Sequence, residues 1–78
     1  MKAETIKRAA ERYGLHAEIK PHTDGRKGVY INRFVYDENR TAKPAPQESL
    51  RKMDRYLKRY KIETESVASW TATLAYGE

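Results

Sequence analysis

The sequence contains no cysteine, and this absence removes two common ways of stabilising a small domain. Both a disulfide framework and a thiolate metal site require cysteine side chains. A structural zinc site built only from histidine and carboxylate would be unusual. We therefore expect one domain, residues 1–78, whose thin core is held by apolar packing or by pairing with a second copy.

Long apolar runs are also missing. No stretch of the sequence approaches the ~20 apolar residues that a membrane-spanning helix needs. The first 14 residues, MKAETIKRAAERYG, lack the apolar segment of a secretory signal. These absences predict a cytoplasmic protein that has no membrane partner.

Recognisable catalytic patterns are scarce. Glu18-Ile19-Lys20 matches the Glu-x-Lys element of restriction-type nucleases, but the aspartate that should precede it is missing, since the first one is Asp24. His16 and His22 would lie roughly 20 Å apart on an extended segment, which is too far to share a metal ion. No serine has a nucleophile elbow, and no glycine-rich loop has P-loop spacing. We therefore predict no enzymatic activity, no catalytic residue, no metal and no cofactor.

Positive charge, by contrast, is abundant and concentrated. The chain has 16 lysines and arginines against 11 acidic residues, a net charge of +5. The segment 51–61 alone carries a net charge of +5, because it contains six cations and a single acid, Asp54. The cations are Arg51, Lys52, Arg55, Lys58, Arg59 and Lys61. A partner with an anionic surface is the first candidate that this distribution suggests.

The same segment has the pattern of an amphipathic helix over residues 46–61. At 100° per residue, one side collects the apolar side chains Leu50, Met53, Leu57 and Tyr60. The cations fall on the opposite side, and Pro46 suits the first turn of a helix. One helix is therefore predicted both to build the core and to present the charge.

Periodicity predicts the other elements. A helix is expected over residues 2–13, ended by Gly14, and a strand over residues 15–20. An Asp-Gly turn at residues 23–28 should lead into a strand over 29–36, followed by a loop over 37–46. A final strand is expected over 65–76, with the apolar face Ala68, Trp70, Ala72, Leu74 and Tyr76.

The resulting fold class is α+β, in the order α-β-β-α-β. Such an order is typical of a three-stranded, mainly antiparallel sheet with two helices on one face, a truncated ferredoxin-like arrangement. The two faces of strand 29–36 both carry apolar bulk, so the pattern leaves open which face is buried. An Arg-Tyr pair followed by one residue and an apolar one occurs at 12–15 and again at 59–62, which favours two similar helix ends over a duplication.

Aromatic side chains provide a second candidate surface. Tyr30, Phe34 and Tyr36 share one face of the strand predicted over 29–36. On an exposed sheet such a row can stack bases, as in RNA-recognition modules. The alternative is that these rings belong to the core or to a homodimer interface. The candidate binding residues are thus Arg51, Lys52, Arg55, Lys58, Arg59, Tyr30, Phe34 and Tyr36.

In size, lack of cysteine and high charge, the chain resembles the small α+β accessory proteins of phages and mobile elements, anti-CRISPR inhibitors among them. This resemblance implies a non-enzymatic inhibitor, active in the host cytoplasm, that binds a bacterial defence complex. The positive charge argues against mimicry of DNA and favours docking of the basic helix on an acidic protein surface or a nucleic acid. A DNA- or RNA-binding module that uses the basic helix and the sheet aromatics is the alternative, and a homodimer is a third.

Overall fold

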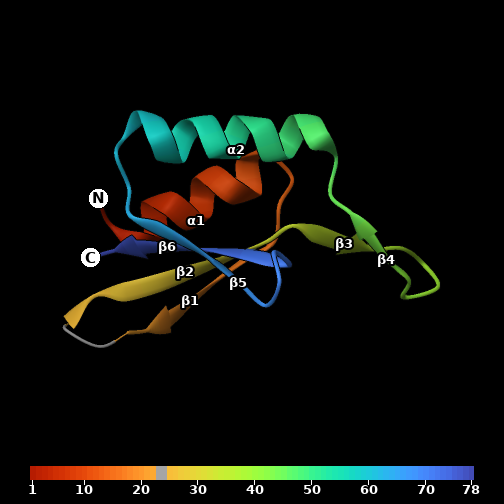
Figure 1. Cartoon of the computed structure of the whole chain (residues 1–78), viewed down its shortest axis with the longest axis horizontal. Helices are drawn as coiled ribbons and strands as arrows, with labels where there is room; N and C mark the ends of the chain where they lie inside the picture. The colour runs from red at the N-terminus through yellow and green to blue at the C-terminus, as the bar shows by residue number, and fades with distance from the viewer. Residues whose placement is uncertain (23–24) are drawn as a thin grey trace.

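The chain folds into two helices and six strands within residues 1–22 and 25–78, the part described by the computed structural model. Four strands form one antiparallel sheet in the order β1-β2-β6-β5, and β3 pairs with β4 in a separate two-stranded sheet. Both helices lie on the same side of the larger sheet (Figure 1). The elements are α1 (Ala3–Arg12), β1 (Ala17–Pro21), β2 (Lys27–Asn32), β3 (Phe34–Tyr36), β4 (Ala42–Pro44), α2 (Gln47–Arg59), β5 (Thr64–Val67) and β6 (Ala72–Gly77).

The α+β class and the mainly antiparallel pairing are confirmed, but the main sheet has four strands instead of the predicted three. The single strand predicted over 65–76 is wrong, because the chain reverses between β5 and β6. Ala68, Ser69 and Trp70 adopt the left-handed conformation, with φ of 51°, 54° and 69°, and the Thr71 N–H donates to the Ala68 carbonyl at 3.1 Å. A truncated ferredoxin-like arrangement is not confirmed by this strand order.

The strand predicted over 29–36 is also interrupted. It ends as β2 at Asn32 and resumes after Arg33 as β3, and β3 pairs with a strand, β4, inside the predicted loop 37–46. The turn between β3 and β4 is closed by Asp37, whose Oδ1 accepts hydrogen bonds from the N–H groups of Asn39 and Thr41, each at 2.9 Å. The bond from Thr41 is the main influence that lowers the pKa of Asp37.

The hairpin predicted at the Asp-Gly turn joins β1 to β2, which pair antiparallel with Ala17 opposite Ile31. Thr23 and Asp24 of that turn lie outside the described residues. Lys27 and Gly28, the last two residues of the predicted range 23–28, already belong to β2.

The helices cover the face of the sheet that carries the smaller side chains of β6. Val29 of β2 and Ala75 of β6 are paired, fully buried and part of the same core as the buried residues of both helices. Leu74 alternates to the other face, where it packs beside Gly28. The predicted apolar face of the last strand is therefore the one turned away from the helices. At the end of β6, α1 approaches so closely that a Cβ at Gly77 would lie 2.7 Å from the backbone of Ala3.

Both helices end with a Schellman motif, which explains the repeated Arg-Tyr pattern. In α1 the N–H of Leu15 donates to the carbonyl oxygen of Ala10 at 2.9 Å. In α2 the N–H of Ile62 donates to the carbonyl oxygen of Leu57, also at 2.9 Å. The two similar helix ends predicted from the sequence are confirmed.

Lys61, the left-handed residue just beyond the end of α2, offers a test of this motif. Lys61 has φ 53° where the matching residue of α1, Gly14, has φ 82°. Because a side chain disfavours the left-handed conformation, Lys61→Gly should raise the free energy of unfolding by about 1 kcal/mol. Thermal unfolding should show this as a melting temperature about 4–8 °C higher. The matched variant Gly14→Ala should lower it, and a melting temperature unchanged in both variants would contradict the interpretation.

Candidate functional site

The five cations predicted on α2 all lie on its solvent side. We call them the cationic face, and they are Arg51, Lys52, Arg55, Lys58 and Arg59, every one of them exposed. The opposite side of the helix buries Met53 and Leu57 in the core. The amphipathic helix predicted over residues 46–61 is confirmed, with its helical bounds at Gln47 and Arg59.

Most of this charge has no internal partner. Lys52 pairs with Glu48 one turn earlier, at 3.2 Å between Nζ and Oε1. Across residues 1–22 and 25–78, no carboxylate lies within ion-pair distance of the other four cations. Four of the five cations are thus available to an external anion without the loss of an ion pair to the described residues.

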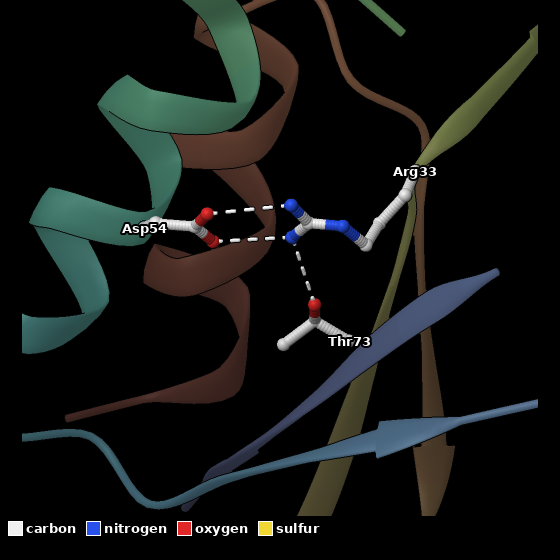
Figure 2. A network of polar contacts seen from close by, with 3 residues as sticks. All are labelled: Arg33, Asp54 and Thr73. Carbon is white, nitrogen blue, oxygen red and sulfur yellow. Dashed lines mark hydrogen bonds and ion pairs between the residues drawn. The ribbon is translucent and has the colours of Figure 1, made fainter. Parts of the chain in front are cut away.

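The single acid of the segment, Asp54, is held away from the cationic face. Arg33, which lies between β2 and β3, extends its guanidinium group towards α2 (Figure 2). Its two terminal nitrogens donate to the two carboxylate oxygens of Asp54 at 3.2 and 3.4 Å, and one of them also donates to Oγ1 of Thr73 at 3.2 Å. Arg33, which interrupts the apolar pattern of its strand, therefore neutralises the one negative charge of the basic segment.

A double-mutant cycle tests this contact. The variants Arg33→Met and Asp54→Asn, alone and combined, should give a coupling free energy of about 0.5–1 kcal/mol in unfolding. The value is modest because the side chain of Asp54 is 51% exposed, so solvent screens the pair. Chemical denaturation of the four proteins measures it. Strictly additive effects of the two substitutions would mean that the pair contributes nothing.

A groove lies between the carboxyl end of α1 and the second half of α2, and four of the five residues of the cationic face help to line it. Its volume is about 770 Å³, and we call it the tyrosine groove. Its lining consists of five cations and three tyrosines: Arg12, Tyr13, Lys52, Arg55, Tyr56, Lys58, Arg59 and Tyr60. No carboxylate is among these lining residues. The groove thus combines positive charge with aromatic surface, a pairing suited to anions that carry rings.

The three tyrosines form a contiguous cluster. The ring centroids of Tyr13 and Tyr56 are 6.5 Å apart in an edge-to-face arrangement, and those of Tyr56 and Tyr60 are 4.8 Å apart. Tyr56 is half-buried, and its burial is the main cause that raises the pKa of its phenol above the ordinary value. Tyr60 is 49% exposed, although a rotation of about 100° per residue places it on the apolar side of α2.

Arg12 and Tyr13 were not among the candidate binding residues from the sequence. Arg12 is the last residue of α1 and Tyr13 caps it, so only the packing of the two helices brings them to α2. The one signal that could have indicated them is the repeated Arg-Tyr pair, which ends both helices and supplies the groove from both.

The predicted aromatic row is not a continuous surface. Tyr30 is half-buried in β2, on the face turned away from the helices, with Lys20 Nζ 5.2 Å from its ring centroid. Phe34 and Tyr36 belong to β3 in the smaller sheet, and Arg33 interrupts the strand between them and Tyr30. Tyr30 and the cationic face therefore lie on different sides of the main sheet.

Among the described residues, no group of three or more acidic or histidine side chains could hold a metal ion. His16 and Glu18, exposed on β1 and its approach, have Nε2 and Oε1 3.3 Å apart. Within the same residues, neither helix is long and apolar enough to cross a membrane. Comparison with protein-family models, with curated proteins and with solved structures gave no match to this chain.

Proposed function

We propose that this protein is a non-enzymatic binding protein that docks on the phosphate backbone of a nucleic acid through the cationic face of α2. The observation that carries the proposal is the unpaired state of Arg51, Arg55, Lys58 and Arg59 within the described residues. Phosphate oxygens are the anions that arginine and lysine bind most widely, and the affinity comes from the release of condensed counterions.

The geometry of α2 supports this choice over a merely solvated helix. An ordinary surface helix mixes both charges, whereas here the carboxylate of Asp54 is bound by Arg33. Of the five residues of the cationic face, only Lys52 forms an ion pair with an acid of the described residues. Like charges held close together repel one another and destabilise the free protein. A polyanionic partner offsets this repulsion when it binds.

The salt dependence of binding tests the proposal. Fluorescence anisotropy with labelled DNA and RNA, at about 50 and 200 mM salt, should give a log–log slope of about −3 to −5, as expected for about five phosphate contacts. At physiological salt we expect a dissociation constant on the order of 10⁻⁴ to 10⁻⁶ M, typical of sequence-independent binding. Absence of binding at the lower salt concentration would overturn the proposal.

A second candidate is an inhibitor that docks the same helix on an acidic protein surface of a bacterial defence complex. It is favoured by the exposed Tyr60 beside Arg55 and Arg59, because tyrosine and arginine are enriched among the residues that dominate protein interfaces. The size and charge that resemble anti-CRISPR inhibitors agree with it. Capture of such a complex that survives nuclease treatment, together with no binding to free nucleic acid, would select this function.

A further inference from the structure

The tyrosine groove has features that the cationic face alone does not need. Binding of a duplex backbone requires exposed cations, and those lie along the outer side of α2. The groove adds three aromatic rings and a hollow of about 770 Å³, within the range of about 300–1,000 Å³ that is usual for ligand sites. An aromatic hollow between cations suits a planar group that is attached to phosphates.

We infer, on the basis of the proposed function, that the preferred ligand is single-stranded nucleic acid, with an unpaired base stacked on Tyr60 in the tyrosine groove. The phosphates on either side of that base are held by Arg12 of α1 and by Arg55 and Arg59 of α2. A base in a duplex has both faces covered by its neighbours, so the ring of Tyr60 can contribute only to a single strand.

Tyr60 is held in place before any ligand binds. Its N–H donates to the carbonyl oxygen of Tyr56 at 3.1 Å, and the Schellman motif at the end of α2 fixes the backbone that follows. The ring of Tyr56 lies 4.8 Å away, centroid to centroid, and supports that of Tyr60 from within the cluster. With 49% of Tyr60 exposed, aromatic surface remains for a base. Such pre-organisation reduces the entropy lost on binding.

The supporting ring is fixed from the other side as well. The hydroxyl group of Tyr56 donates to the sulfur of Met1 at 3.3 Å, and its ring meets Tyr13 edge-to-face. Burial raises the pKa of the Tyr56 phenol above its ordinary value, which favours the neutral form of this side chain. It therefore adds no negative charge that would repel the phosphates beside it.

The cations of the groove surround the rings rather than forming a separate patch. Arg12 lies on the α1 side, whereas Arg55 and Arg59 lie on the α2 side, and the guanidinium carbon of Arg59 is 5.7 Å from the ring centroid of Tyr60. A strand that crosses the groove can thus place a base on the ring and its neighbouring phosphates on arginines from both helices.

The test compares three labelled ligands on the full chain. Two are single strands of about 12 nucleotides with equal phosphate number, oligo-dT and an abasic oligonucleotide, and the third is a blunt duplex of about half that length, which matches their total number of phosphates. We expect oligo-dT to bind about 5- to 100-fold more tightly than the abasic strand, the range that stacking of one base provides. Equal affinity of these two ligands, each showing salt-dependent binding, would overturn the inference and leave the proposed function standing. No binding of any ligand at about 50 mM salt would overturn the proposed function itself.

Substitutions locate the effect. Tyr60→Ala should lower the affinity for oligo-dT about 5- to 100-fold and leave the duplex and the abasic strand unaffected, whereas Tyr60→Phe should retain the affinity. Tyr36→Ala, at a tyrosine that is 71% exposed on β3, is the matched control and should change nothing. An equal loss for all three ligands with Tyr60→Ala, or a loss with Tyr36→Ala alone, would contradict stacking on Tyr60. The comparison of wild-type ligands decides the question even where a variant fails to fold.

Discussion

Replacing Arg51, Arg55 and Arg59 together by glutamate should lower the affinity for nucleic acid on the order of 10³-fold at about 50 mM salt. The three side chains are exposed and have no carboxylate partner among the described residues, so the protein should remain folded. Each phosphate contact contributes about 0.9 to the log–log salt slope, and the loss of three contacts should reduce that slope by about 2.7. Anisotropy measurements over a salt series give both quantities.

The control must change the total charge equally while leaving α2 intact. Arg8, Lys27 and Arg40 are exposed cations outside α2 and outside the tyrosine groove. Replacing these three by glutamate should weaken binding far less, because none of them lies on α2 or lines the tyrosine groove. An equal loss in both triple variants would show that net charge, and not its position on α2, determines the affinity.

Gly77→Ala should be the most damaging of the small substitutions to the fold. A methyl group at this position would lie 2.7 Å from the backbone nitrogen and from Cα of Ala3, which begins α1. Neither atom can move without shifting the helix, so we expect a loss of about 1–3 kcal/mol in the free energy of unfolding. That is a large share of the roughly 4–12 kcal/mol that a chain of this length commonly has. Chemical denaturation measures the loss directly.

Gly28→Ala is the matched control for this prediction. Its new methyl group would also meet an atom at 2.7 Å, but that atom is Cδ1 of Leu74, the end of a flexible side chain. A rotation of Leu74 can relieve the contact, so the loss should be smaller than for Gly77→Ala. Equal losses at the two positions would mean that the close approach of α1 to β6 is not what requires glycine at 77.

The elements with strong periodicity could be predicted from the sequence, and those defined by a change of direction could not. The apolar side of α2 and the alternation of β1 both depend on local burial, which the residue pattern records directly. The reversal of the chain between β5 and β6 produces no such pattern in the sequence. It uses Ala68, Ser69 and Trp70 in a conformation that usually requires glycine, while the apolar alternation continues through it.

The candidate site likewise contains a part that could be predicted from local periodicity and a part that could not. The cationic face belongs to one helix, so helical periodicity alone is sufficient to place Arg51, Arg55 and Arg59 on a common side. The groove depends on tertiary packing, because Arg12 and Tyr13 come from another helix. In the sequence, Arg33 is a charged residue on an otherwise apolar strand face, and this pattern does not indicate a partner. Its pairing with Asp54 depends on the tertiary structure.

The arrangement of charges on α2 also determines how the free protein responds to salt. Arg51, Arg55 and Arg59 follow one another at intervals of four residues, so each repels the next along the helix. Like charges at this spacing destabilise a helix by about 0.2–0.5 kcal/mol per pair. Dissolved ions screen that repulsion, and a bound polyanion removes it. Salt should therefore strengthen the unbound fold while it weakens the complex, and the polyanion acts in part as the counter-charge that this helix lacks.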